Sequence, residues 1–463
     1  ILFIFLFFIY FLCYQSVLSH VIYYQEQHHL FLYSKTFFLQ HIQSQGWMSY
    51  LTAFIIQFFH IPTIGSILLA GILALIYLLT NDAIKKITGH NDLLLLSLIP
   101  SIYLFLYSMT VDHSLTPIIA TFLGLLIMGL FHQITVRPWS FIRKIYSPLP
   151  PNNKYRLLIY SLLIAIYAGT SKEKNWENVL TQTEKYINSG RTNQLISYFH
   201  NLALYHTEKL PYQLFDYPQK LGVKALYFPW NSDSRESEYG HFIYEDLGYI
   251  NEAQRWEFEA MVVWGETVPH LLNLARYNIV NKRPEVARRF INLLKQSLFY
   301  RKDAEELEKQ LHAGSVPGLR MALENNKEHP ARFANVINIG PELQYLCEQD
   351  TTNRMAFEYL MSDLLLSNNV VRFVDNLKFI RHFKYPEMPP AYQEALYIYK
   401  LGVDGETFSK SGFNVSENTE KRFQRYYNLY KNRQMQRLKA EFGNTYWYYL
   451  NFISPYGDKI ISN

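Results

Sequence analysis

The sequence has few of the residues and motifs that usually mark a metal protein or an enzyme. Its 463 residues include two cysteines, Cys13 and Cys347. Cys13 lies in an apolar run that belongs in lipid, so no internal disulfide is predicted, and no Cys/His cluster has zinc spacing. There is no Walker loop and no GxGxxG, HExxH or GxSxG motif. Nucleotide-binding, metalloprotease and serine-hydrolase functions therefore lack support, and no metal or cofactor is predicted.

Charged residues are scarce in the first part of the chain. Leu, Ile and Phe dominate residues 1–170, whereas charged residues and Tyr are scattered from Ser171 onward at the density of a water-soluble protein. We therefore predict a membrane domain over residues 1–170 and a water-soluble domain over residues 171–463. The net charge of +5 arises largely from basic loops of the membrane domain, so nucleic acid is not a predicted partner.

Five hydrophobic runs predict about five transmembrane helices. They cover Ile1–Tyr23, Thr63–Thr80, Leu93–Met109, Pro117–Ile134 and Leu157–Tyr167, of which the last is the shortest. The first run exceeds a signal-peptide core and has no small-residue cleavage site, so we interpret it as a span. Because the chain starts inside this run and without a methionine, we expect the natural N-terminus to precede Ile1.

The loops between these runs differ in their basic residues, which predicts their side of the membrane. The loops after the second and fourth runs contain Lys85, Lys86, Arg137, Arg143, Lys144, Lys154 and Arg156. In contrast, Lys35 is the only Lys or Arg among residues 25–62, and residues 111–116 contain neither. Since cytoplasmic loops retain positive charge, we predict a bacterial inner-membrane protein whose N-terminal end is cytoplasmic and whose C-terminal domain is periplasmic.

The first outer loop contains aromatic residues at near-helical spacing, near residues 37–59. Gln and Ser occupy the positions between them, and Gly46 and Pro62 punctuate the segment. This pattern predicts an interfacial helix whose aromatic face enters the lipid boundary while its polar face meets water.

The water-soluble half has no sustained alternation of apolar and polar residues, so it predicts helices and no strands. Two helix junctions are similar: Leu247–Ala253, which contains Gly248, and Val280–Ala287. Their alanines, Ala253 and Ala287, are 34 residues apart (287 − 253), the tetratricopeptide (TPR) period, at which a small residue lets helices approach closely. The predicted fold class is all-α, a multi-span transmembrane helical bundle followed by a degenerate TPR-like α-solenoid. The alternative is that two amphipathic hairpins align by chance.

Solenoids of this type generally present a concave face to a peptide or a partner protein. Several aromatic groups could line such a face, although core packing is their more common use. They are Trp176, Phe228–Trp230, Trp256, Trp264 and Tyr446–Tyr449.

Ionisable residues gather in the predicted outer loops of the bundle and form the one candidate site for chemistry. They are Glu26, His28, His29, His41, Asp112 and His113. An acid after the first span, then an interfacial helix and a second span, resembles the layout of multi-span transferases that act on lipid-linked sugars. The resemblance covers the segment from the first span to the second.

This resemblance implies roles for individual residues. Glu26 would be the base toward the acceptor, Asp112 a metal ligand or second acid, and Lys35 or one of the histidines would meet the phosphate. Two features depart from the class: five spans are fewer than it normally uses, and Gln25 and Gln27 flank Glu26 where a paired acid would stand. The alternative is that these groups lie solvated among lipid headgroups.

The chain as a whole also resembles a known family. The blocks that carry the resemblance are Tyr24–Gln27, Leu30–Phe31, Phe54–Phe59, Asn201–Leu204, Phe258–Ala260 and Tyr392–Leu396. They are similar to an uncharacterised Bacteroidetes family of multi-span membrane proteins with a C-terminal tetratricopeptide-like helical domain. The family implies this architecture over almost the whole length, but it brings no established activity and no catalytic residues.

Two functions remain compatible with the sequence. The first is a membrane-anchored extracytoplasmic scaffold whose helical repeats bind a protein or peptide partner, with membrane lipid around its bundle. The alternative is a transferase that acts on a polyprenyl-phosphate sugar, with the repeats recruiting the acceptor polypeptide.

Overall fold

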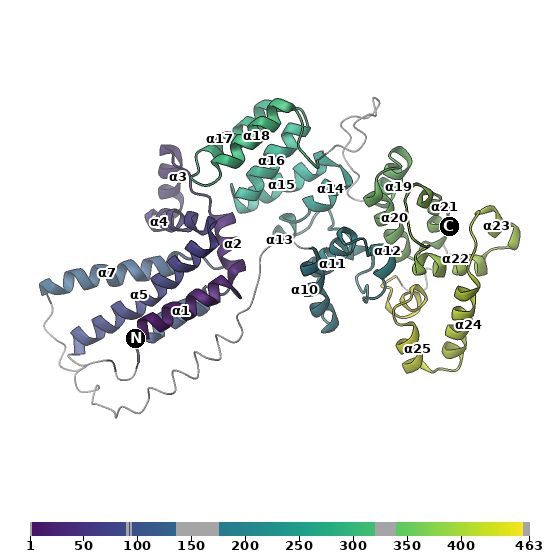
Figure 1. Cartoon of the computed structure of the whole chain (residues 1–463), viewed down its shortest axis with the longest axis horizontal. Coiled ribbons are helices and arrows are strands. Elements are labelled where there is room, and N and C mark those ends of the chain that lie inside the picture. Colours follow the sequence, from purple (N-terminus) through teal and green to yellow (C-terminus); the bar gives the residue numbers. More distant parts are fainter. Residues whose placement is uncertain (1, 89–91, 93–94, 136–175, 320–338, 457–463) are drawn as a thin grey trace. The chain divides into compact units, whose positions relative to one another are not determined.

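The computed structural model describes residues 2–88, 92, 95–135, 176–319 and 339–456. Within these ranges the regular elements are helices, and the only extended pairing is an isolated bridge between Val316 and Leu319 (Figure 1). The all-α prediction is confirmed. The chain divides into two compact units, and each unit contains more than one stretch of the sequence.

Unit 1 consists of Ile1–Glu173, Trp264–Ala275 and Pro284–Ala313, so it is not delimited by a single cut near residue 170. Its described helices are α1 (Leu2–Gln15), α2 (Ser19–His28), α3 (Lys35–Gln45), α4 (Trp47–Ile56), η1 (Gln57–His60), α5 (Pro62–Thr88), α6 (Leu98–Tyr107), α7 (Thr116–Thr135), α17 (Pro284–Lys295) and α18 (Arg301–Ala313). Helix α16 (Val268–Val280) is shared between the two units.

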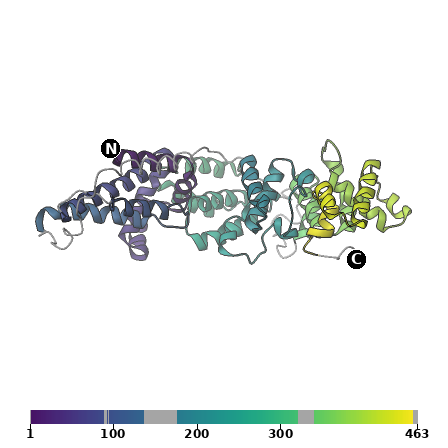
Figure 2. The same cartoon turned by 90° about the horizontal axis from the view of Figure 1, so that it is seen from below.

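Helix α5 is the centre of the N-terminal bundle, which we define as α1, α2, α5, α6 and α7. It packs against α1, α6 and α7, and α1, α5 and α7 lie side by side in two perpendicular views (Figures 1 and 2). The core between these helices is apolar, with two hydroxyl pairs that join α1 to α6. The Tyr10 hydroxyl lies 2.9 Å from Ser101 Oγ, and the Tyr14 hydroxyl lies 2.5 Å from Ser108 Oγ. These pairs satisfy polar groups that would otherwise be costly in an apolar core.

One described helix, Pro62–Lys86 within α5, is both long and apolar enough to cross a membrane. Helices α1 and α2 pass this test only as a pair, and they bend by 71° at the break between them. Helix α6 and the Thr116–Gly129 part of α7 are apolar but shorter. The predicted fifth span, Leu157–Tyr167, and the basic loop before it lie outside the described residues. A bundle of five spans therefore stays a prediction.

The aromatic segment near residues 37–59 forms two helices and a short 3-10 turn. Gly46 separates α3 from α4, with a positive φ of 84° that favours glycine. Its N–H donates to the carbonyls of His41 and Ile42, which ends α3, while Ser34 Oγ accepts the Phe37 N–H at the start of that helix. A single glycine thus divides the predicted interfacial segment.

Unit 2 consists of Lys174–Val263, Arg276–Arg283 and Gly314–Asn463. Its longer described helices are α10 (Trp176–Asn188), α11 (Gln194–His206), α14 (His241–Leu247), α15 (Ile250–Trp264, whose last residue falls in unit 1), α19 (Ile339–Gln349), α20 (Arg354–Leu366), α21 (Val370–Asn376), α22 (Pro390–Gly402), α24 (Glu417–Lys431) and α25 (Met435–Phe442). Shorter elements are α12 (Leu210–Gln213), η2 (Gly222–Ala225), α13 (Ser234–Ser237), η3 (Leu377–His382), α23 (Gly405–Lys410), α26 (Tyr446–Tyr448) and η4 (Tyr449–Ile453).

Large aromatic side chains fill the core of unit 2. Trp256 and Trp447 are almost completely buried, as are many tyrosines, whereas Trp230 is 54% exposed. Helices α24 and α25, labelled in Figure 1, pack around one such cluster, which contains Tyr426, Phe442 and Trp447. The aromatic richness of this half therefore serves mainly for helix packing.

Candidate functional site

Glu26 is a buried carboxylate of unit 1. It lies in the last turn of α2, and its side chain is only 6% exposed. Ile22, one turn earlier on the same helix face, is fully buried, so the helix directs Glu26 inward rather than to solvent. A carboxylate in such a place is costly unless hydrogen-bond donors replace its water.

Three side chains from three segments surround the carboxylate. The Tyr300 hydroxyl donates to Oε1, and the Gln27 amide donates to Oε2 at 2.5 Å. His60 Nδ1, from η1, lies 3.4 Å from Oε1. The same Gln27 amide also donates to the Tyr300 oxygen at 2.9 Å, which closes a small network. Glu26 is thus fixed from several directions.

Tyr300 is held in its neutral, donating form. Burial raises the pKa of its phenol far above the usual range, and the neighbouring Glu26 charge raises it further. Its hydroxyl therefore keeps its proton near neutral pH and donates a hydrogen bond to the carboxylate. A hydrogen bond to an ionised acceptor is stronger than one between neutral groups.

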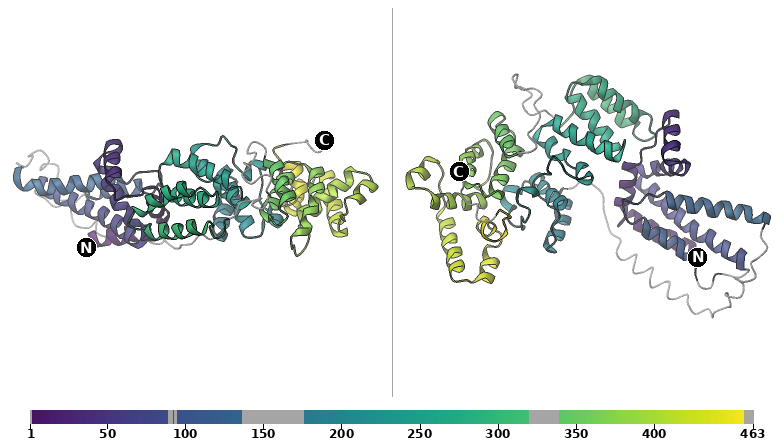
Figure 3. Two further views of the ribbon diagram at one scale, coloured as in Figure 1. Left: turned by 90° about the horizontal axis from the view of Figure 1, so that it is seen from above. Right: turned by 180° about the vertical axis from the view of Figure 1, so that it is seen from behind.

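Tyr300 belongs to the turn between α17 and α18, residues 296–300, which we call the docking turn. The two helices lie side by side (Figure 3). The Gln296 carbonyl accepts the Tyr33 N–H at 2.9 Å, and the Phe299 ring stacks on His60 with centroids 4.9 Å apart. The docking turn therefore attaches the α17–α18 hairpin to the end of the N-terminal bundle by backbone, aromatic and charge-assisted contacts.

Little free space remains beside Glu26. The cavity there measures about 10 Å³, and its lining includes His29, Phe31, Gln57 and the docking turn. That volume suits about one water molecule. In this arrangement a sugar or a phosphate group cannot reach the carboxylate.

The other predicted site residues do not share this cavity, with the exception of His29. His29 Nδ1 lies 2.9 Å from the Gln25 carbonyl, and burial lowers the pKa of its imidazole, an effect that this bond opposes. His28 stacks on the Tyr24 ring at 3.8 Å. His41 lies 3.2 Å from Ser49 Oγ, and burial lowers its pKa as well. Lys35 is exposed at the start of α3.

Asp112 and His113 lie in the turn between α6 and α7. The Gln25 amide reaches this turn and donates to the carbonyls of Val111 and His113 at 2.9 and 3.0 Å. His113 stacks on Tyr107 at 4.3 Å, and Asp112 is exposed and outside the lining of the Glu26 cavity. Gln25, the residue before Glu26, therefore binds this turn. The side chain of Asp112 is not brought to the Glu26 carboxylate.

The residues that mark the two predicted helix junctions are Gly248, Ala253 and Ala287, and the two alanines occupy the same position in their helices. Gly248 ends α14 with φ +80°, and its N–H donates to the Glu245 carbonyl. Ala253 and Ala287 are both fully buried, and each lies three residues after the first residue of its helix, α15 or α17. The 34-residue spacing thus corresponds to the same helical position twice.

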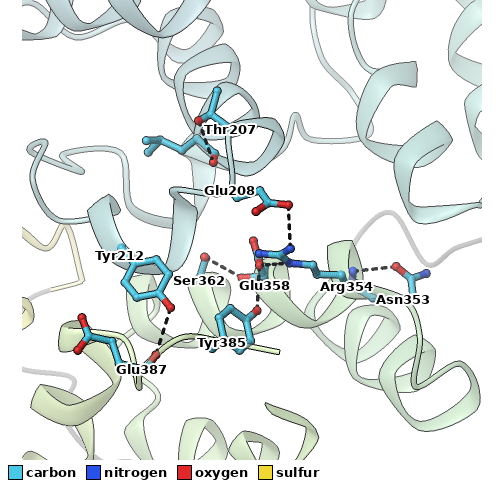
Figure 4. A network of polar contacts seen from close by, with 11 residues as sticks. Thr207, Glu208, Tyr212, Asn353, Arg354, Glu358, Ser362, Tyr385 and Glu387 are labelled. Carbon is cyan, nitrogen blue, oxygen red and sulfur yellow. Dashed lines mark hydrogen bonds and ion pairs between the residues drawn. The ribbon is translucent and has the colours of Figure 1, made fainter. Parts of the chain in front are cut away.

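Unit 2 contains a second buried carboxylate network, centred on Glu358 of α20 (Figure 4). Arg354 Nε donates to Glu358 Oε1 at 2.7 Å, and the Tyr385 hydroxyl donates to the same oxygen at 2.9 Å. Arg354 also reaches Glu208 at 3.2 Å. Burial raises the pKa of Glu358, and the Arg354 charge opposes that shift. The network has the form of a buried ion pair that joins helices rather than of an open site.

Among the described residues, no group of three or more His, Cys, Asp or Glu side chains is placed to hold a metal ion. A model for a family of unknown function, DUF6057, matches residues 1–171 and 163–453. The chain belongs to DUF6057. No curated protein and no solved structure matches it. The two matched segments together span nearly all of this DUF6057 chain, so the family includes both the apolar and the charged half.

Sequence reasoning selected Glu26 in this DUF6057 chain but missed its partners. Tyr300 is 274 residues away in sequence, and no local pattern links the two. It also missed a buried acid of unit 2, Glu394, for which a signal existed. Glu394 lies three residues after Ala391 and four before Ile398, a helical spacing that places it on the apolar face of α22.

Proposed function

We propose that the chain is a membrane-anchored scaffold that holds a protein or peptide partner on its helical repeats outside the cytoplasm. The observation that carries this proposal is the set of hydrogen bonds that the Glu26 carboxylate accepts. Its carboxylate is closed by Tyr300 and Gln27 and binds the docking turn to the bundle. An acid used in this way supports an anchoring role for the site more than a catalytic one.

The surface of the N-terminal bundle supports the membrane part of the proposal. On α1, Ile4, Phe8 and Leu12 recur every fourth residue, and each is about half exposed. On α6, Ile99, Tyr103 and Leu106 are exposed to a similar or greater degree. Contiguous apolar stripes of this kind are rare on proteins that face water on all sides, and lipid would cover them. The long apolar helix α5 lies at the centre of the same bundle.

The helical repeats support the binding part of the proposal. The repeated alanine position in α15 and α17 is the feature expected of stacked helix pairs. Such repeats usually serve as surfaces for polypeptides, and this is a proposal from architecture rather than from a catalytic group. The predicted periplasmic location of these repeats follows from the basic residues of the loops.

The alternative, a transferase that acts on a lipid-linked sugar, needs room for its substrate beside Glu26. The cavity of about 10 Å³ does not supply that room. A transferase would therefore have to release the docking turn before each reaction.

Native mass spectrometry of the intact protein, extracted gently from its own membranes, tests the proposal. We expect a stoichiometric protein or peptide partner that stays bound to the wild type and to Glu26→Gln. Glu305→Gln, an exposed acid of α18, is the matched control. A retained polyprenyl phosphate that is lost in Glu26→Gln but kept in Glu305→Gln, with no polypeptide bound, would overturn the scaffold in favour of the transferase.

A further inference from the structure

Unit 2 contains a cavity of about 180 Å³ between α12, α22 and the segments around Arg422 and Asn444. Its lining includes two carboxylates, one guanidinium, one amide and two aromatic rings: Asp216, Glu394, Arg422, Asn444, Tyr212 and Phe215. An engineered protein cavity of about 150 Å³ is large enough for benzene. This cavity can therefore hold a group of about six heavy atoms, unlike the space at Glu26.

Glu394 forms the buried end of the cavity. Its residue is only 2% exposed, and its Oε2 accepts the Tyr446 N–H at 2.8 Å. Its Oε1 lies 3.2 Å from the Arg422 guanidinium, which in turn lies over the Trp447 ring at 5.7 Å. The one cation in the lining is therefore already engaged by a carboxylate and a ring.

Asp216 forms the more open end of the cavity. Within the described residues its carboxylate receives one side-chain donor, the Asn444 amide, at 3.2 Å from Oδ1. Partial burial raises the pKa of this carboxyl, because the charged form loses water that one amide does not replace. A cation placed beside Oδ2 would restore that lost stabilisation.

The two aromatic rings of the lining make contacts of their own with unit 2. The Tyr212 hydroxyl donates to the Glu387 carbonyl at 3.1 Å, as Figure 4 shows. Phe215 packs against Tyr446 and Tyr449, with ring centroids 5.4 and 5.1 Å away. Aromatic faces accept both alkyl chains and cations. Both rings are thus held in place by contacts with other parts of unit 2.

The balance of charge decides the class of ligand. Glu394, whose pKa burial raises to about 7, is paired with the Arg422 guanidinium, so the lining carries a net charge between 0 and −1 near neutral pH. The only cation of the lining is thus engaged while Asp216 faces the cavity, which disfavours an anion. The groups are too few for calcium, which takes six to eight oxygen ligands. An organic cation with an apolar stem satisfies Asp216, fills the space and contacts the rings. We infer that this cavity binds the side-chain end of a lysine or arginine residue.

This inference rests on the proposed function, because the basic side chain would belong to the polypeptide partner. A pocket for one basic residue would select partner segments that carry it at an exposed position. Unit 2 would then recognise a sequence feature of the partner rather than any available chain.

The test uses the full chain in nanodiscs of zwitterionic lipid and follows peptide binding by ligand-observed NMR. The probes are acetyl-Gly-Lys-Gly-amide and its arginine counterpart, and the neutral comparison replaces lysine with norleucine. Asp216→Asn removes the open carboxylate and keeps the Asn444 contact. Glu406→Gln, an exposed acid of α23 outside the cavity, is the matched control.

We expect at least one basic peptide to bind at least tenfold more tightly than the norleucine peptide. Asp216→Asn should weaken that binding at least tenfold, and Glu406→Gln should leave it unchanged. Equal binding of the neutral peptide, no binding of either basic peptide, or binding that survives Asp216→Asn would overturn the inference. If the natural partner stays bound to Asp216→Asn in native mass spectrometry, the scaffold stands and only the cavity assignment falls. If the wild type holds no partner, the scaffold falls irrespective of the peptide titration.

Discussion

The carboxylate of Glu26 has exchanged most of its water for protein donors. Tyr300, Gln27 and His60 come from three segments of unit 1, and together they occupy both carboxylate oxygens. When a buried acceptor loses one of its donors, no water replaces the lost hydrogen bond. The free energy of unfolding then falls by about 1–3 kcal/mol. The stability of the docking turn should therefore depend on the Tyr300 hydroxyl.

Replacing Tyr300 with phenylalanine keeps the ring and removes only the hydroxyl. We expect Tyr300→Phe to lower the free energy of unfolding by about 1–3 kcal/mol, measured by denaturant titration in detergent. Tyr427→Phe, at a position that is 52% exposed, should change it by less than about 0.5 kcal/mol. Equal effects of the two variants would show that the contact with Glu26 does not stabilise the fold.

Glu394 should make the stability of unit 2 depend on pH. Burial raises the pKa of this carboxyl from 4.5 to about 7, against the opposing effects of the Tyr446 N–H and Arg422. Below about pH 4.5 the group is protonated in both the folded and the unfolded chain, and its contribution to stability is fully present. Between about pH 4.5 and 7 the unfolded chain releases this proton while the folded chain keeps it, so stability falls with rising pH by about 3 kcal/mol and levels off above the folded pKa.

The measurement is the free energy of unfolding between pH 4.5 and 7.5. Glu394→Gln stays neutral and should remove most of this decrease, whereas Glu406→Gln should keep it. A profile that is the same for Glu394→Gln and the wild type would contradict the assignment.

At the scale of elements, local patterns predicted much of the helical structure. The 34-residue spacing of Ala253 and Ala287 corresponds to α15 and α17, because burial of one helix face leaves a periodic pattern in the sequence. The segment near residues 37–59 was predicted as one helix, but Gly46 divides it. The bend of 71° between α1 and α2 was not predicted either, because the run from Ile1 to Tyr23 is mainly apolar and contains no Gly or Pro to mark a break.

The start of α5 depends on a close approach at Gly65. A Cβ there would lie 3.0 Å from the Phe59 backbone and 3.0 Å from Ile22 Cγ2, so α5 would have to move away from η1 and α2. We expect Gly65→Ala to destabilise unit 1 by about 1–3 kcal/mol, more than the gain from better helix propensity. Thermal unfolding in detergent is the measurement.

Gly71 in the same helix is the matched control. The nearest atom to a Cβ there is the Phe7 ring at 3.9 Å, an ordinary contact. Gly71→Ala should therefore be neutral or stabilising by up to about 1 kcal/mol. If both alanines had the same effect, the close approach at Gly65 would not limit the packing.

At the scale of the whole molecule, composition separated an apolar half from a charged half, and the all-helical class followed from periodicity. Composition could not predict that Pro284–Ala313 packs with residues of the first half in unit 1. Contacts such as Glu26 with Tyr300 form only when distant segments meet, and they leave no local pattern. The same limit explains why Glu26 could be selected from the sequence while its partner could not.

The proposed scaffold requires that the N-terminal bundle anchor the helical repeats on the outer side of a membrane. Alkaline phosphatase, which is active only outside the cytoplasm, and a fluorescent protein that matures only inside it can each be fused after Asn463 and expressed in a Gram-negative host. We expect an active phosphatase and a dark fluorescent fusion, both in the membrane fraction. An inactive phosphatase with a bright fluorescent fusion would place the repeats in the cytoplasm and contradict the proposed scaffold.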